Sequence, residues 1–179
     1  MVNWEDAALW AAAATWVLAV GTLLVLYWQT RQAGILNSAN AVITLRERFD
    51  SPRMRRARRH TSERLMNNDL GDITSLEVLT FFELIGAQTK RKILDEKMVW
   101  EAFGGWITSY YHAMRTPVDR IQQLRDASRD PLLFHKFEWL NHRISTLDRQ
   151  QLGSAYGASV EAVEMTGLLL RREAVLEVD

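Results

Sequence analysis

The sequence predicts an all-α protein, in which one N-terminal transmembrane helix continues into a cytoplasmic helical bundle. Three observations predict this fold class. A long stretch without charge, rich in apolar side chains, fills residues 7–30. Beyond it, apolar residues recur every three or four positions, which places them on one face of a helix. The 179 residues include only 3 prolines and no repetitive run, so there are few helix breakers.

Residues 7–30 form the expected membrane span, with Glu5 and Asp6 before it and Arg31 after it. Most of this stretch as a helix measures about 33 Å, enough for the ~30 Å hydrocarbon core of a bilayer. A cleaved signal peptide begins with a basic segment, whereas this flank is acidic. A buried helix of a soluble protein is the alternative, because the alanine-rich half is only weakly apolar. The residues that mark the span are Ala7, Trp10, Trp16, Gly21, Tyr27 and Trp28.

The charges beside the span predict its orientation. No lysine or arginine precedes it, whereas Arg31, Arg46 and Arg48 follow it. Loops with an excess of Lys and Arg stay on the cytoplasmic side of a membrane. We therefore expect a single-pass protein of the inner (cytoplasmic) membrane, with the N-terminus outside and the body cytoplasmic. The lipid bilayer is then its first partner.

Small residues follow one another at helical spacing along the span. Such a stripe lets two helix backbones approach closely in lipid and favours a homo-oligomer. The alternative is that alanine is merely common in this helix. The candidates for self-association are Ala11, Thr15, Ala19 and Thr22.

A juxtamembrane helix is expected over residues 31–51, after the N-terminal tip and anchor at 1–30. Its apolar stripe would pack either on the domain's own helices or on a second copy. Ser51 as a cap and Pro52 at the first helical position predict that the next helix begins there. The stripe repeats every seven residues through Trp28, Ile35, Val42 and Phe49.

An arginine-rich stretch opens the next helix. The simplest interpretation is a solvated helix face that pairs with the acidic segment after it. Anionic lipid headgroups or nucleic-acid phosphates are the alternatives. Nucleic acid is disfavoured because the whole chain is balanced, with 22 basic and 22 acidic residues, and not basic. The basic patch comprises Arg53, Arg55, Arg56, Arg58 and Arg59.

Residues 52–150 are the expected cytoplasmic helical domain, and 151–179 a tail with a last short helix. A helix over 74–91 is apolar almost all round, which is typical of a central helix. Glu83 lies inside this apolar run. A buried carboxylate requires a partner, and we expect an arginine such as Arg120 or Arg125.

Three further helices complete the predicted domain. Asp95 caps a short helix that Gly104 and Gly105 end. A long helix over 106–124 is kinked or broken at Pro117. A last helix begins at Asp130–Pro131 and runs to about residue 150.

No chemistry-bearing motif stands out. The chain has no cysteine, which excludes disulfides, thiol nucleophiles and iron–sulfur clusters within it. We find no catalytic triad and no phosphate loop, so we expect no enzyme and no cofactor. His135, Glu138 and His142 share one helix face at a spacing that can hold a divalent metal. Three ligands on one helix would need a fourth from elsewhere, so a metal site is not favoured.

Several short aromatic motifs together resemble a family. They are similar to a bacterial and phage-associated family of membrane-anchored helical proteins, known as domain of unknown function four-seven-six-zero. The resemblance implies no activity and covers about residues 28–147. It also implies that Glu83, Arg125 and Glu138 form a polar set in the core. The motifs are residues 81–86 (FFELIG), 100–104 (WEAFG), Trp106 with Tyr110 and Tyr111, Arg125, and 137–140 (FEWL).

The function expected from these observations is that of an interaction, scaffold or regulatory protein. It would be tethered to the membrane, self-associate and hold an unknown cytoplasmic protein partner. The first alternative is a membrane-active effector, of the toxin or phage-defence type, that acts by oligomerising in the bilayer. A further alternative is binding of anionic lipid or nucleic acid through residues 53–59.

Overall fold

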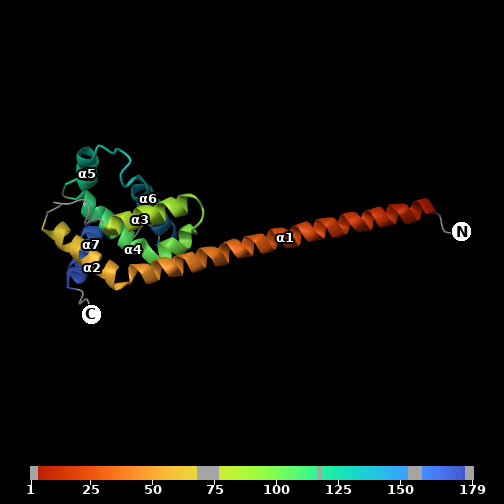
Figure 1. The fold of residues 1–179 in the computed structure, drawn as a ribbon, viewed down its shortest axis with the longest axis horizontal. Helices are drawn as coiled ribbons and strands as arrows, with labels where there is room; N and C mark the ends of the chain where they lie inside the picture. Colours follow the sequence, from red (N-terminus) through yellow and green to blue (C-terminus); the bar gives the residue numbers. More distant parts are fainter. Residues whose placement is uncertain (1–3, 68–76, 117, 153–158, 176–179) are drawn as a thin grey trace. The chain divides into compact units, whose positions relative to one another are not determined.

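The computed structural model describes residues 4–67, 77–116, 118–152 and 159–175, and leaves the side chains of 4–14, 17, 19, 152 and 159–165 undescribed. The prediction of an all-α chain is confirmed, because every regular element in the described ranges is a helix (Figure 1). The chain divides into two compact units, residues 1–38 and residues 39–179. The helices are α1 (Trp4–Phe49), α2 (Pro52–Met66), α3 (Glu77–Lys90), α4 (Glu96–Arg115), α5 (Arg120–Ser128), α6 (His135–Leu152) and α7 (Ser159–Ala174).

The first unit consists of the larger part of α1. Across the residues that the structure describes, no helix is at once long enough and apolar enough to span a membrane. The predicted span at 7–30 is therefore not supported by the structure. Its first third, residues 7–14, lies outside the described side chains, as do Val17 and Ala19. The self-association candidates Ala11 and Ala19 consequently have no described surroundings.

The second unit begins inside α1, whose last turns pack into its core. Val42, Leu45 and Phe49 are buried there. Phe49 lies at the centre of an aromatic cluster, with ring centroids at 5.4 Å from Phe81 and at 5.6 Å from Phe103. The apolar stripe after residue 38 thus packs on the domain's own helices, the first of the two predicted alternatives.

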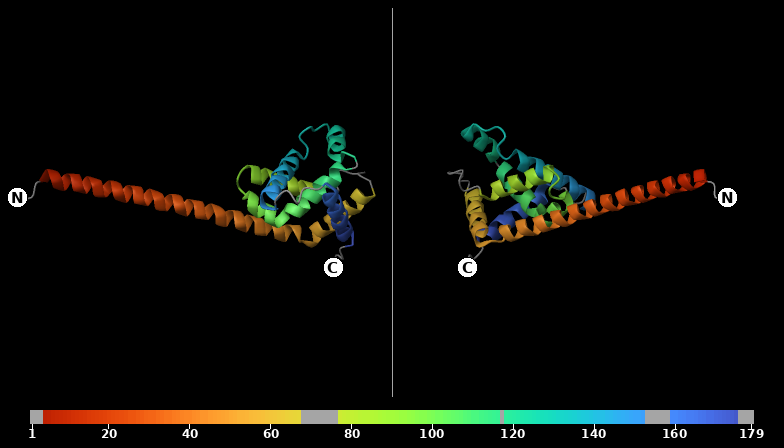
Figure 2. Two further views of the ribbon diagram at one scale, coloured as in Figure 1. Left: turned by 180° about the vertical axis from the view of Figure 1, so that it is seen from behind. Right: turned by 45° about the vertical axis from the view of Figure 1, so that its right-hand side comes forward.

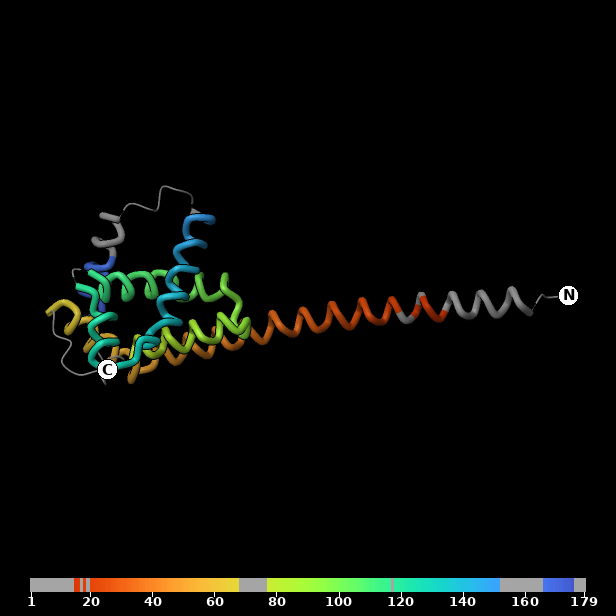
Figure 3. The backbone as a smooth tube through the Cα atoms, turned by 90° about the horizontal axis from the view of Figure 1, so that it is seen from above, coloured from red at the N-terminus to blue at the C-terminus, as the bar shows by residue number. Residues whose placement is uncertain are grey.

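Helix α3 is the central helix, and it packs chiefly against α6 (Figure 3). Phe82 of α3 stacks on Phe137 of α6, with ring centroids 5.6 Å apart. Gly86, one turn further along α3, lies against the backbone of Lys136. A Cβ at this glycine would come within 2.8 Å of the Lys136 carbonyl carbon and still closer to its oxygen. The missing side chain is what lets the two helices approach so closely.

Helix α4 continues through Gly104 and Gly105, where the sequence predicts a helix end. Asp95 caps it as predicted, since its side chain accepts the N–H groups of Lys97 and Met98 at 3.0 Å. The predicted end at Gly104 and Gly105 is wrong, because α4 continues to Arg115. Gly104 packs beside Trp100 and Ile144, and burial of the flanking apolar residues overrides the weak helix propensity of glycine.

The break predicted at Pro117 is confirmed, because α4 ends at Arg115 with Thr116 as its C-cap, whereas the start of α6 differs from the predicted position. Helix α5 begins at Arg120 after the end of α4 at Arg115, so residues 106–124 are not one helix. Helix α6 begins at His135 and not at Asp130, because Arg129 and Phe134 adopt left-handed backbone conformations. The views in Figure 2 show α5 joined to α6 by this non-helical connection, with α2 and α7 packed side by side.

Candidate functional site

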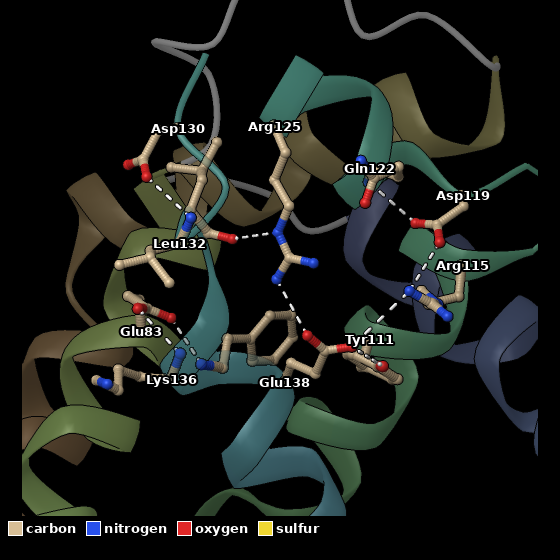
Figure 4. Close-up of polar contacts among 12 residues, drawn as sticks. Glu83, Tyr111, Arg115, Asp119, Gln122, Arg125, Asp130, Leu132, Lys136 and Glu138 are labelled. Carbon is tan, nitrogen blue, oxygen red and sulfur yellow. Dashed lines mark hydrogen bonds and ion pairs between the residues drawn. The ribbon is translucent and has the colours of Figure 1, made fainter. Parts of the chain in front are cut away.

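The first turn of α6 receives its cap from another helix. Glu83 of α3 accepts the backbone N–H of Lys136 at 3.0 Å and that of Phe137 at 2.6 Å (Figure 4). The first N–H groups of a helix have no partner within it, and a carboxylate there also meets the positive end of the helix dipole. The arginine partner expected for Glu83 is therefore wrong: backbone amides satisfy this carboxylate.

Arg125 and Glu138 meet on the opposite side of the same turn. Arg125 on α5 donates to the Glu138 carboxylate at 3.0 Å and to the Leu133 carbonyl at 2.9 Å. Tyr111 on α4 donates its hydroxyl to Glu138 at 3.3 Å. Burial raises the pKa of Tyr111, and the neighbouring Glu138 carboxylate raises it further. The phenol is therefore a neutral hydrogen-bond donor at neutral pH.

Together these contacts fasten three helices around the start of α6. Figure 4 shows Glu83 of α3 pointing to the first turn of α6, and Arg125 of α5 pointing to Glu138 on that turn. Arg115 extends the network, with a nitrogen 2.7 Å from Asp119 and 3.8 Å from Glu138. An open hollow beside it is lined by Gln122, Arg125, Asp126, Arg129 and Pro131. The carboxylates of Glu83 and Glu138 each accept hydrogen bonds from donors on neighbouring elements, so this arrangement positions the helices.

The metal candidate is not assembled. His135 and His142 are exposed, while Glu138 is turned towards Arg125 and Tyr111. Among the described residues, no group of three His, Asp or Glu side chains is placed to hold a metal ion. The shared helix face was a correct reading of the spacing, but the ion pair takes the carboxylate that a metal would need.

The predicted basic patch separates into three kinds of environment. Arg53 and Arg59 form ion pairs with Glu77 and Glu63, at 2.9 and 3.0 Å. Arg55 and Arg56 are exposed. Arg58 is not on the surface at all, because only 4% of it is exposed. The assignment of Arg58 to a solvated basic face is therefore wrong.

Arg58 instead lies at the centre of a buried polar cluster. Its guanidinium is 4.2 Å from the ring centroid of Phe49 and 5.0 Å from that of Trp106. Its Nε is 3.2 Å from the carboxylate of Glu173 on α7, which is 2% exposed. Burial raises the pKa of Glu173, and the adjacent Arg58 opposes that shift.

Tyr110 closes the cluster from α4. Its hydroxyl and that of Ser62 lie 3.1 Å apart and share a hydrogen bond. Glu173 is not predictable from the sequence pattern, because its contact with Arg58 joins residues far apart in the chain. The burial of Arg58, in contrast, has a signal in the sequence of α2. Met54, Arg58 and Leu65 share one face of α2 at helical spacing, and two of them are apolar.

The part of α1 in the first unit carries a run of exposed apolar side chains. Those of consecutive residues 23–28 all lie in the exposed class, as do Leu18 and Val20 before them. Thr22, within the run, donates its hydroxyl to the Leu18 carbonyl at 2.8 Å and so presents little polarity outward. We call residues 18–28 the apolar collar.

The family resemblance is confirmed by comparison with known proteins. A family model described as Domain of unknown function (DUF4760) matches residues 5–144. No match was found among curated proteins or among solved structures. The match covers α3 and the first part of α6, which form the Glu83 contact, and most of the domain core.

Proposed function

Since the chain belongs to the DUF4760 family of unknown function, we propose that it is a helical binding module held at a lipid bilayer by α1. The anchor is the segment 7–30, and the second unit is the part that meets a protein partner on the cytoplasmic side. The proposal rests chiefly on the apolar collar.

The collar is apolar on every side of the helix. At 3.6 residues per turn, the exposed residues 23–28 pass more than once around the helix axis. A coiled coil needs one apolar seam and leaves the other faces polar. A helix that is apolar all round is typical of a protein core or a membrane span. Lipid is therefore the surrounding that best matches this pattern.

The charges along α1 support the same arrangement. The sequence has no charge from residue 7 to residue 30, and Arg31 follows directly. Placing one Arg or Lys near the middle of a span costs about 2.5–3.5 kcal/mol in insertion experiments. The absence of such residues from 7–30 favours insertion into a bilayer. Because arginines follow the span and none precedes it, the positive-inside rule favours a cytoplasmic second unit.

A binding role for the second unit is supported by how its polar groups are used. The carboxylates of Glu83 and Glu138 hold α6 in place, and that of Glu173 faces Arg58. The rigid helical frame that results presents side chains on its surface, which suits recognition of another macromolecule.

Carbonate washing of membranes tests the proposal. A C-terminally tagged chain should remain in the membrane pellet, and the tag should be cut by protease in inverted vesicles but not in spheroplasts. Leu18→Arg places a charge in the middle of the segment and should release the chain into the wash. Leu36→Arg is the matched control, because Leu36 is 64% exposed against 71% for Leu18 but lies beyond Arg31. Release of the wild-type chain by carbonate would refute the anchor.

A further inference from the structure

We propose that the surface of α2 and α4 that α7 covers, called the groove from here on, is a docking site for an amphipathic helix, and that α7 is its tethered and exchangeable occupant. The helix it takes carries an apolar residue and a carboxylate one turn apart, as α7 does with Leu170 and Glu173. This inference is independent of the membrane anchor, since all of its residues lie in the second unit.

The groove already shows how it recognises such a helix. Helix α7 packs against α2 and α4. Leu170 and Glu173 are 6% and 2% exposed, so the two side chains enter the groove on one helix face. Arg58 stands at its floor, held over the rings of Phe49 and Trp106. A guanidinium fixed in this way selects a carboxylate over a neutral side chain.

Most of the described domain core comes from helices other than α7. Of the core residues that the structure describes, Leu170 alone comes from this helix. The aromatic cluster around Phe49 and the stacked pair of Phe82 and Phe137 are supplied by α1, α3, α4 and α6. The described aromatic rings of the core thus come from helices other than α7, which contributes Leu170 at the edge of their packing.

The polar character of the contact favours exchange. A buried ion pair adds stability only when its geometry and hydrogen bonds compensate for the loss of water. Arg58 Nε and Glu173 Oε2 lie 3.2 Å apart, yet neither atom completes an aligned hydrogen bond within the described residues. Loss of Glu173 would leave the Arg58 charge buried and unpaired, so the pair acts mainly by penalising a helix that lacks the carboxylate.

The extent of the family match points the same way. Both walls of the groove, α2 and α4, lie within residues 5–144, whereas α7 lies beyond them. The docking surface thus belongs to the part of the chain shared with the family, while its occupant lies outside the matched region.

Binding of a labelled peptide to the full-length chain tests the proposal. The peptide has the sequence of residues 159–175 and is followed by fluorescence anisotropy. Glu173→Ala in the chain weakens the tethered helix, so this variant should bind the wild-type peptide at least tenfold more tightly than the wild-type chain does. Equal affinity for the two chains, or no binding to either, would overturn the proposal.

Matched peptides identify the recognised face. Peptides with Leu170→Ala or Glu173→Ala should bind the variant chain at least tenfold more weakly than the wild-type peptide. A peptide with Leu168→Ala should bind within twofold, because Leu168 is 59% exposed in the docked helix. Loss of binding in all three, or in none, contradicts docking through this face.

Hydrogen exchange on the wild-type chain provides a test that needs no variant. Amides of α7 should exchange at least a hundredfold faster than those of buried α4, because α7 leaves the groove without global unfolding. Equal rates for α7 and α4 would make α7 an integral part of the fold and reject exchange. If the chain forms a dimer that dissociates when the peptide is added, the α7 of a second copy occupies the groove. That result would support the groove as a docking site for a helix.

Discussion

The carboxylate of Glu83 accepts the backbone N–H of Phe137 at 2.6 Å, so α3 supplies the N-terminal cap of α6. Caps normally come from the residue just before a helix. Here the left-handed conformation of Phe134 turns the chain abruptly into α6, and the cap comes from a residue far away in the sequence. The contact therefore joins the formation of one helix to the docking of another.

Replacing Glu83 should destabilise the fold. Glu83→Ala removes the acceptor of two amides, and we expect a loss of about 1–2 kcal/mol in the free energy of unfolding, as for other caps. Glu83→Gln retains an acceptor without the charge and should lose less. Urea unfolding measures both. Thr80→Ala, an exposed change on the same helix, should stay within about 0.5 kcal/mol of wild type.

Alanine at two glycines should have opposite effects. Gly86→Ala drives a methyl group into the Lys136 backbone, which cannot move aside as a side chain can, so we expect a loss of about 1–3 kcal/mol. Gly105→Ala meets no atom within 4 Å, so the gain in helix propensity should stabilise the chain by about 0.5–1 kcal/mol. Thermal unfolding of the pair measures the difference. Equal effects at the two positions would contradict the close approach of α3 to α6.

Arg125 should not be replaceable by lysine. Its two donors point in fixed directions, to Leu133 and to Glu138. Arg125→Ala should lower the free energy of unfolding by about 1–2 kcal/mol, a modest value because Glu138 is partly exposed. Arg125→Lys cannot reproduce both contacts and should recover less than half of the loss. A double-mutant cycle with Glu138→Gln should give a coupling energy above zero, and additive effects would show that the pair does not act together.

Tyr110 should make the fold sensitive to alkali. Burial raises its pKa well above the ordinary value near 10. The stability that its neutral form provides is complete below pH 10, and it is lost as the pH rises towards the folded-state pKa, because the unfolded chain then ionises first. Tyr110→Phe removes this dependence. Unfolding curves from pH 8 to 11 should fall less steeply for the variant than for wild type.

The same variant has a separate cost at neutral pH. It breaks the hydrogen bond with Ser62, which is fully buried, and should lower stability by about 1–2 kcal/mol. The two stability curves should therefore converge as the pH rises. Parallel curves would show that the phenol is not shielded from water as the structure describes.

Local signals in the sequence correctly predicted the starts of α2 and α4. Ser51 and Pro52 were read as a cap and first turn, and α2 begins there with the Ser51 hydroxyl accepting the Met54 N–H at 3.3 Å. Asp95 is likewise the cap of α4. These caps depend on residues within one helical turn of each other, so the local sequence is enough to predict them.

Contacts between distant residues were not predictable in this way. Gly104 and Gly105 resemble a helix end locally, but packing on α6 carries α4 through them. Arg58 lies in a run of arginines that looks solvated, and its partner Glu173 is more than a hundred residues away. The sequence predicts that Glu83 needs a partner. The partners are backbone N–H groups of α6, and they could not be identified without knowing where α6 begins.

Phe49 has a consequence for the order in which the chain is made. It is the first of the core rings to leave the ribosome, and Phe81, Phe82, Phe103 and Trp106 all follow it. Its ring stays uncovered until half of the protein has been synthesised. Native pairings between distant residues form slowly, and exposed apolar groups invite aggregation meanwhile. The apolar collar leaves the ribosome before Phe49 does. Insertion of α1 into a bilayer during synthesis would therefore shield the collar before the domain packs around the Phe49 ring.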